Sequence, residues 1–287
     1  MLWLPFSLLN SFFESIASAW SKHSAERIDV FSTAWAQRFF ALFILLPLVL
    51  ITHSFQSVSS TFWLALVSTS LLNTLNSLLF IRALKISPLS FTLPLIAFTP
   101  AFLLITSPLM INEFPRLLGV LGVILVVVGS YVLNLHLLRV SWLEPIKAVW
   151  REPGARLMLL VAFIWSITSN IDKLAINNSN SILFSLLSNF LVLIFLTLIF
   201  IVRRISFKPI FRTWRILAPV GIASGLSTLF QMVAVSMTVV PNAIAVKRTS
   251  TIFGVLWGKL FFKEKHMQER LAGVIVMVAG VALIALS

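Results

Sequence analysis

The sequence contains no cysteine among its 287 residues. Disulfides, zinc–thiolate sites, iron–sulfur clusters and cysteine nucleophiles are therefore excluded. Charged side chains are also scarce, at 11% of the chain, whereas an ordinary soluble domain has about 25%. The four histidines show no metal-ligand spacing, and the chain has no G-x-x-x-x-G-K motif for a phosphate-binding loop. We therefore predict no cofactor, no enzymatic activity and no transport driven by nucleotide hydrolysis in this chain.

The residues that are abundant are apolar. Hydrophobic residues make up 59% of the chain, and its mean hydropathy is +1.01. This composition leaves too little polar surface for a soluble protein and predicts a multi-pass membrane protein. A net charge of +13 is compatible with nucleic-acid binding, but in so apolar a chain basic loops that fix membrane topology explain it better. We predict a lipid bilayer as partner and no nucleic acid.

Ten apolar stretches are long enough to span a bilayer, and the connections between them are short. The first span carries Glu14 and has no basic flank or cleavage site, so we do not interpret it as a signal peptide. The predicted fold is an all-α integral membrane protein with ten transmembrane helices. The spans run over 2–21, 32–51, 61–81, 89–111, 117–138, 157–176, 182–202, 216–239, 241–262 and 271–286.

The two halves of the sequence resemble each other when one is shifted by 151 residues, the separation of Lys22 and Lys173. Apolar identities carry little weight in a leucine-rich chain, whereas the matched polar residues and glycines carry more. The matches include Ser15/Ser166, Lys22/Lys173, Glu113/Glu264, Gly122/Gly273 and Gly129/Gly280. Because each half has an odd number of spans, the second must enter the membrane from the opposite side, which gives inverted repeats. We predict one repeat over 1–138, a basic connecting loop over 139–156 and a second repeat over 157–287.

The positive charges are distributed unevenly between the two sides. Most Lys and Arg residues lie in the connections after the odd-numbered spans, including "RRISFKPIFRTWR" (203–215) and "KEKHMQER" (263–270). Because positively charged loops stay in the cytoplasm, these connections are predicted to be cytoplasmic and both termini outside. We predict a location in the plasma (inner) membrane, as a monomer or homodimer.

Two long stretches carry a family resemblance. They are "ALKISPLSFTLPLIAFTPAFLLITSPLMINEFPRLLGVLGVILVVVGSYVL" in the first half and "KRTSTIFGVLWGKLFFKEKHMQERLAGVIVMVAGVALIAL" in the second. In each, a small-residue and Pro-rich span is followed by a Glu-ended loop and a glycine-spaced last span. This pattern and the ten-span plan resemble the drug/metabolite transporter superfamily, with the EamA-domain family as the nearest branch. The resemblance implies a transporter. It also implies cytoplasmic termini, but the loop charges of this sequence predict the opposite.

Lys247 and Arg248 stand side by side inside the predicted ninth span. Each charge costs about 2.5–3.5 kcal/mol at the centre of a membrane helix. Either the two side chains reach the interface and neighbouring carbonyls, or they face a cavity between the repeats and bind an anion. The matching positions of the first half are the apolar Ile96 and Ala97, so the pair is specific to one repeat. A Lys-Arg pair in the ninth span also resembles the triose-phosphate translocators, in which it contacts the substrate phosphate.

The remaining candidate binding residues are also polar side chains within spans. Glu14 is either a proton carrier or the ion-pair partner of Arg38 or Lys247. Asn and Gln side chains in spans usually join helices by hydrogen bonds, although some can line the path. Asp172 and Lys173 are interpreted as a local or interfacial pair. The predicted substrate-binding residues are Lys247, Arg248, Thr249, Ser250, Arg38, Glu14, Asn170, Asn189 and Gln231.

The function predicted from these features is a secondary transporter that moves a small anionic metabolite, bearing phosphate or carboxylate, by alternating access. Two alternatives remain: an amino-acid or drug exporter of the EamA type, which would not need the cation pair, and a flippase for a phosphate-headed lipid. A membrane-embedded enzyme would need a nucleophile with a base, or metal ligands, and the sequence offers neither pattern.

Overall fold

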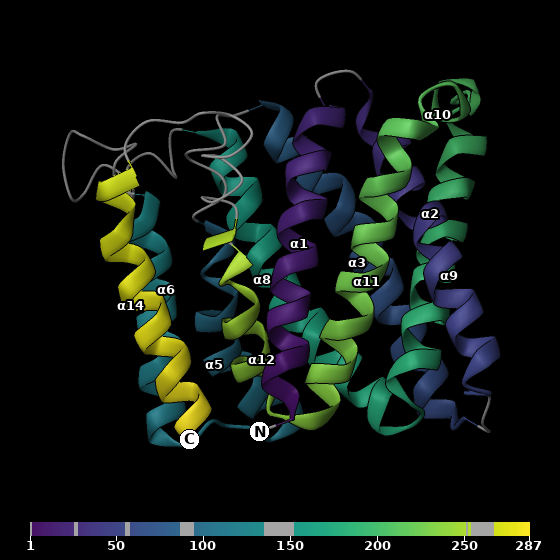
Figure 1. Cartoon of the computed structure of the whole chain (residues 1–287). Helices are drawn as coiled ribbons and strands as arrows, with labels where there is room; N and C mark the ends of the chain where they lie inside the picture. Colours follow the sequence, from purple (N-terminus) through teal and green to yellow (C-terminus); the bar gives the residue numbers. More distant parts are fainter. Residues whose placement is uncertain are drawn as a thin grey trace.

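The computed structural model describes residues 2–25, 28–54, 58–86, 95–134, 152–250, 252–253 and 267–287. These residues form eleven α-helices, and none of them lies in a β-strand. In Figure 1 most helices stand side by side, with both chain ends at one end of the bundle and the short helix α10 at the other. The first-half helices are α1 (Trp3–Ala25), α2 (Val30–Ile51), α3 (Ser60–Ile86), α5 (Thr99–Ile111) and α6 (Leu117–Asn134). The second-half helices are α8 (Pro153–Asn177), α9 (Ser181–Val202), α10 (Lys208–Arg212), α11 (Trp214–Met237), α12 (Val240–Lys247) and α14 (Met267–Leu286).

Ten of these helices overlap the ten predicted spans, and α10 lies in a stretch predicted as a connection. In the ninth predicted span, 241–262, α12 ends at Lys247, a turn follows at Arg248 and Thr249, and Ser250, Ile252 and Phe253 are again helical. The helix α8 begins at Pro153, four residues before the predicted start of the sixth span. Parts of the fourth, fifth and ninth spans, and residues 139–151 of the predicted connecting loop, lie outside the described residues.

Several helices begin where the sequence supplies a cap or a proline. The side chain of Asp29 accepts a hydrogen bond from the backbone N–H of Ser32 before α2, and Asn180 accepts one from Leu183 before α9. These bonds satisfy N–H groups that have no partner within the helix. Pro153 and Pro241 lie in the first turn of α8 and α12, where the missing N–H costs nothing.

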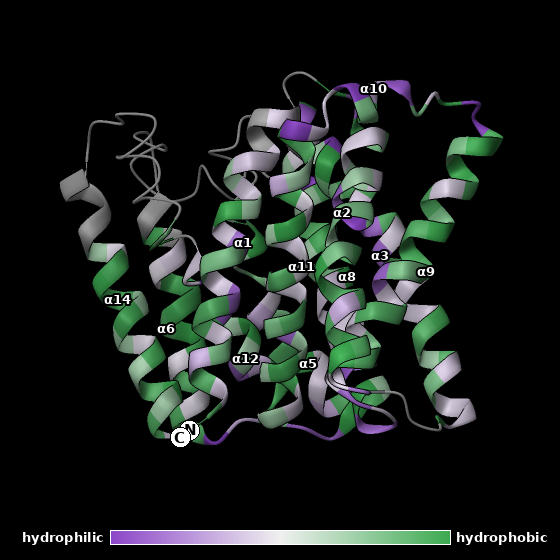
Figure 2. Ribbon diagram, turned by 45° about the vertical axis from the view of Figure 1, so that its right-hand side comes forward, coloured by the Kyte–Doolittle hydropathy of each residue, from purple (hydrophilic) through white to green (hydrophobic). Residues whose placement is uncertain are grey.

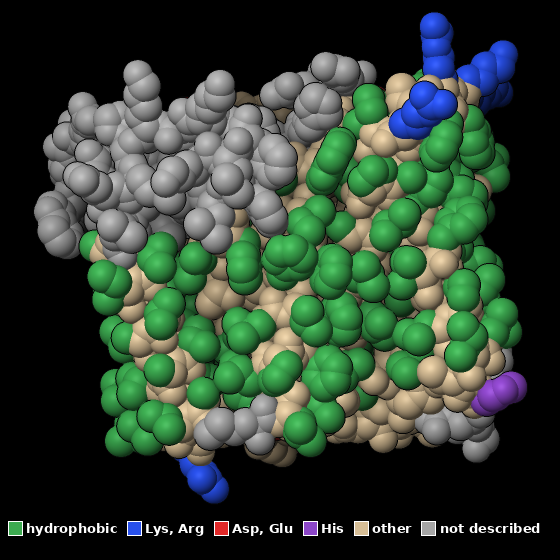
Figure 3. All heavy atoms as spheres, viewed as in Figure 1, with side chains coloured by type: hydrophobic (Ala, Val, Ile, Leu, Met, Phe, Trp, Pro, Cys, Tyr) green, Lys and Arg blue, Asp and Glu red, His purple; other side chains and the backbone are tan. Residues whose placement is uncertain are grey.

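The helices expose the apolar surface that a bilayer requires. Five of the described helices are long and apolar enough to cross a membrane, and three shorter ones are also apolar. Figure 2 shows hydrophobic residues over most of the helices, with hydrophilic ones at the helix ends and at a few positions midway. Figure 3, viewed as in Figure 1, shows a broad hydrophobic band with Lys and Arg side chains standing at its edges. The long helices are α2, α3, α8, α9 and α11, and the shorter ones are Thr99–Ile111, Leu117–Ser130 and Ala272–Ala285.

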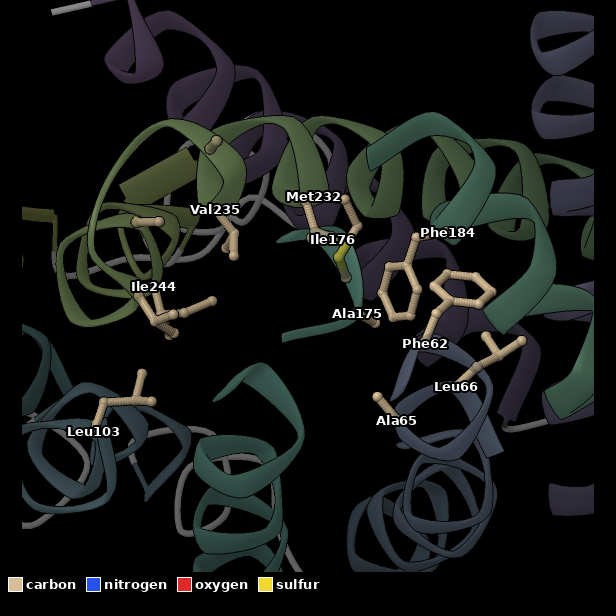
Figure 4. Packing of buried hydrophobic residues seen from close by; sticks show 13 residues of the cluster. Phe62, Ala65, Leu66, Leu103, Ala175, Ile176, Phe184, Met232, Val235 and Ile244 are labelled. Carbon is tan, nitrogen blue, oxygen red and sulfur yellow. The ribbon is translucent and has the colours of Figure 1, made fainter. Parts of the chain in front are cut away.

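The largest buried cluster joins the two halves of the chain (Figure 4). Phe62 of α3 packs edge-on against Phe184 of α9, with ring centroids 6.4 Å apart. Met232 of α11 and Ile244 of α12 belong to the same cluster. Because lipid tails are as apolar as these side chains, close van der Waals packing favours helix association here more than exclusion from water does. The halves therefore form one packed unit rather than two separate bundles.

Helices α6 and α14 pack against each other in antiparallel directions and approach closely at glycines. A Cβ atom on Gly122 would lie 2.6 Å from the carbonyl oxygen of Gly280, and one on Gly280 would lie 2.7 Å from that of Gly122. About two helical turns further along α6, a Cβ atom on Gly129 would lie 2.9 Å from the carbonyl oxygen of Gly273. Only glycine permits backbones to approach this closely, as in other membrane helix pairs.

Replacing Gly280 with alanine should lower the thermal stability of the protein. In an open helix this change stabilises by up to about 1 kcal/mol, but here the added methyl meets the backbone of α6 and should cost about 1–3 kcal/mol. Ala279→Leu, on the exposed face of α14, is the control and should leave stability nearly unchanged. Thermal unfolding in detergent, followed by tryptophan fluorescence, measures the difference. A Gly280→Ala variant more stable than the wild type would contradict the close contact.

Candidate functional site

A polar cavity of about 130 Å³ lies among α1, α2, α3, α8, α9, α11 and α12. An engineered cavity of about 150 Å³ in another protein holds benzene, so this one has room for a group of roughly six non-hydrogen atoms. The charged side chains in its wall are Glu14, Arg38, Asp172, Lys247 and Arg248. The remaining lining residues are Gln37, Asn73, Trp165, Thr168, Ser169, Ser188, Val192, Ser224, Thr228, Gln231, Met232 and Ile244.

The cation pair lies where a helix ends inside the bundle. Lys247 is the last residue of α12, Arg248 is its C-cap, and Arg248 and Thr249 form a turn. The carbonyl oxygens at this end lie within reach of another helix, because the Ser11 hydroxyl of α1 is 2.9 Å from the Val246 oxygen and 3.1 Å from the Lys247 oxygen. A helix C-terminus carries partial negative charge, so cations are favoured there. The broken helix thus compensates part of the cost of burying two positive charges.

Lys247 has a carboxylate and an amide as partners. Its Nζ lies 3.6 Å from Glu14 Oε2 and donates a 2.6 Å hydrogen bond to the Gln231 side-chain oxygen. Glu14 also accepts a hydrogen bond from the Ser227 hydroxyl, at 2.8 Å. Of the two ion-pair partners considered for Glu14, the structure therefore supports Lys247. Helices α1, α11 and α12 meet at this pair, which accounts for one of the cavity's cations.

Trp165 of α8 provides an aromatic wall beside both cations. The Lys247 Nζ lies 6.0 Å and the Arg248 Cζ 5.5 Å from the centre of the indole ring. Such contacts stabilise a cation by about 0.5–2 kcal/mol, more when water is excluded. Arg248 is 6% exposed. Both cations are therefore held in the cavity wall rather than directed toward the membrane interface.

A polar stripe on α3 binds the two other charged groups of the cavity. The stripe comprises Thr69, Asn73 and Ser77, which follow at intervals of four and so share one face of the helix. Thr69 donates a 2.6 Å hydrogen bond to Asp172 Oδ1, and Arg38 donates one of 3.3 Å to Ser77. Thr69 and Ser77 are roughly 12 Å apart along α3. Arg38 and Asp172 are therefore bound to different turns of α3, and the described residues show no ion pair between them.

Asp172 was not among the predicted binding residues, and its interpretation as a local partner of Lys173 was wrong. Lys173 instead lies 3.5 Å from Glu113 Oε1 and donates hydrogen bonds to the carbonyl oxygens of Val235 and Thr238. Asp172 lines the cavity at 5% exposure, and the described residues give its carboxylate one hydrogen bond and no ion pair. The four-residue spacing of the α3 stripe was the signal that could have revealed it.

Arg38 and Gln231 line the cavity together with Glu14 and the cation pair, and the other four predicted residues stand outside its wall. Asn189 donates to the backbone oxygen of Arg38 at 2.8 Å, which ties α9 to α2 behind that side chain. Asn170 ties α8 to α5, where it accepts from Ser107 and donates to Thr106. Thr249 donates to the Val246 oxygen and contacts Ser11, so it stabilises the end of α12. Ser250 lies just beyond that turn.

The chemistry available in this cavity is recognition by charge and hydrogen bonding. Among the described residues, three cations and two carboxylates line it, so these five side chains sum to one positive unit when all are ionised. Hydroxyl and amide groups from Gln37, Thr168 and Thr228 are also present in the wall. In the part of the chain that the structure describes, no three His, Asp or Glu side chains are grouped as metal ligands.

The comparison with protein-family profiles identifies the family. The sequence profile of the EamA-like transporter family matches twice, over residues 1–135 and 152–286. The fold also matches a crystal structure of another protein with a TM-score of 0.74 and 15% sequence identity, over 99% of this chain and 96% of the other. A comparison with curated protein sequences gave no match. The chain is a multi-pass membrane protein and belongs to the EamA-like transporter family, within the drug/metabolite transporter superfamily.

Proposed function

We propose that this protein is a secondary carrier for a small metabolite bearing a carboxylate or phosphate, which binds in the central cavity between two inverted repeats. The repeats are residues 1–138 and 157–287, joined by 139–156, and together they supply ten spans. Lys247, Arg248 and Arg38 attract the negative group of the substrate. Rocking of the repeats exposes the cavity to each side of the membrane in turn.

The inverted arrangement is supported by the contacts between α6 and α14. Gly122 and Gly129 correspond in sequence to Gly273 and Gly280, at the constant offset of 151 residues. In the packed pair, Gly122 meets Gly280 and Gly129 meets Gly273. Each glycine of α6 thus meets the counterpart of the other glycine rather than its own counterpart. Such reciprocal contact is expected when a two-fold axis relates the two helices. Equivalent helices that run antiparallel belong to repeats of opposite orientation.

The observation that carries the anionic substrate is that Lys247 and Arg248 both line the cavity. Glu14 lies beside Lys247, and the described side chains of the wall together carry one more positive than negative charge when all are ionised. A bound anion would bring the formal charge of the cavity to zero. Arg offers two parallel N–H donors for such an oxyanion, and Lys adds a compact charge.

Neutralising either cation should stop anion exchange. We expect Lys247→Gln and Arg248→Gln to lower exchange roughly tenfold to hundredfold, the equivalent of one charge-assisted hydrogen bond of about 1.5–3 kcal/mol. The assay is counterflow in proteoliposomes preloaded with mixed carboxylated and phosphorylated metabolites, which also identifies the substrate class. Arg212→Gln, at the exposed end of α10, is the matched control and should exchange as the wild type does. Folded cavity variants with wild-type exchange would rule out the anion site.

A second candidate function is amino-acid export, because Asp172 offers a carboxylate to an ammonium group in the same cavity. An amino acid would direct its carboxylate toward the Arg38 and Arg248 side and its ammonium toward Asp172. In this case Asp172→Asn should abolish serine counterflow and spare that of glycerate, which has a hydroxyl in place of the ammonium. Equal effects on both compounds would argue against ammonium recognition.

We propose a plasma-membrane location with both termini outside. The chain ends lie at one end of the bundle and α10, with its neighbouring Arg and Lys residues, at the other (Figure 1). The absence of native cysteine permits single-cysteine labelling without background. A membrane-impermeant maleimide added to intact cells should label Ser287→Cys and leave Ser206→Cys unlabelled until the membrane is opened. The reverse pattern would place the termini in the cytoplasm.

A further inference from the structure

Asp172 is a charged cavity residue that neither binds the anion in the proposed site nor forms an ion pair among the described residues. Its side chain is 95% buried, since 5% of its surface is exposed, and it belongs to the cavity wall. The Thr69 hydroxyl occupies one acceptor site of the carboxylate, although an ionised carboxylate has about four such sites. A carboxylate held in this way inside a membrane protein is a costly feature that suggests a function.

From this placement we infer that Asp172 is a specificity-determining residue that limits the substrate to a single negative charge. The inference rests on the proposed function as an anion carrier and adds the charge class of the substrate. The Asp172 carboxylate belongs to α8 and is held by its hydrogen bond from Thr69 of α3. Glu14 lies on α1, and the cation pair lies at the end of α12. A substrate held by the cations therefore presents its far end to Asp172.

The charge balance of the cavity favours a substrate with one negative charge over a substrate with two. The described side chains of the wall sum to one positive unit when all are ionised, so a monoanion brings their total to zero. A dianion leaves one uncompensated negative charge in a small, poorly solvated space beside a carboxylate, which is strongly unfavourable. A hydroxyl at the far end instead donates a hydrogen bond to a remaining acceptor site of Asp172. The cavity accordingly favours a small monoanion with a donor group at its other end.

A structural role for Asp172 is the competing explanation, because its bond to Thr69 joins α3 and α8. Two substitutions distinguish a role in charge selection from this structural role. Asp172→Asn removes the charge and keeps an oxygen that accepts from Thr69. Thr69→Val removes the hydrogen bond and keeps the charge. Exclusion of dianions by Asp172, called the filter below, depends on the charge of its carboxylate. A structural tie between α3 and α8 depends on the hydrogen bond from Thr69.

The test compares glycerate with tartronate, which has a second carboxylate in place of the hydroxymethyl group of glycerate. Wild type should exchange glycerate and reject tartronate in proteoliposome counterflow. Asp172→Asn should raise tartronate exchange relative to glycerate on the order of tenfold, because a like charge has been removed from the cavity. Thr69→Val should still reject tartronate. Thermal stabilisation by each compound, which depends on binding alone, should show the same preferences, and Asp172→Ser serves as a second charge-free variant.

The outcomes distinguish the filter from the carrier function. Gain of tartronate exchange by Asp172→Asn or Asp172→Ser, with continued rejection by Thr69→Val, supports the filter. Wild-type exchange of both compounds, or continued rejection of tartronate by folded charge-free variants, overturns the filter and leaves the anion carrier intact. If wild type neither exchanges nor is stabilised by any anion in the mixed pool, the proposed function fails, and the filter fails with it.

Discussion

The requirement that each buried charge in a membrane protein be compensated governs the organisation of this molecule. Lys247 satisfies it through Glu14, Gln231 and the Trp165 ring, which come from three different helices. The negative end of α12 adds to the compensation at this position. These contacts bring α1, α8 and α11 to the same place as the broken helix. The polar cavity exists at that place because groups that stabilise a charge also attract water and polar ligands.

The compensation is distributed over both halves of the chain. Glu14 and Arg38 come from the first half, and Asp172, Lys247 and Arg248 from the second. The apolar cluster around Phe62 and Phe184 spans the same boundary. A change in how the halves pack would therefore alter the distances between opposite charges in the cavity. Such coupling of helix packing to the charge arrangement is what a carrier needs in order to respond to a bound ion.

The positions of most helices could be predicted from apolar runs alone, because long uncharged segments in a bilayer have helix as their main option. The cation pair and Glu14 could be found by the same rule, since charges inside spans are rare. The break after Lys247 could not, because "KRTST" contains neither Gly nor Pro and the carbonyls at the break are satisfied by Ser11 from a distant helix. Asp172 was missed for a related reason: its sequence neighbour Lys173 suggested a local pair, whereas adjacent helix residues face different directions.

The glycine contacts between α6 and α14 also bear on how the sequence can change over generations. Each contact joins a position in one half to a non-equivalent position in the other, as Gly122 is joined to Gly280. A side chain gained at one position removes the space that the partner backbone occupies, so neither half can drift independently there. The Lys247–Arg248 position carries two charges, whereas the position 151 residues earlier, Ile96–Ala97, is apolar. A substitution at the cation pair changes the charge of the cavity without adding a side chain between α6 and α14.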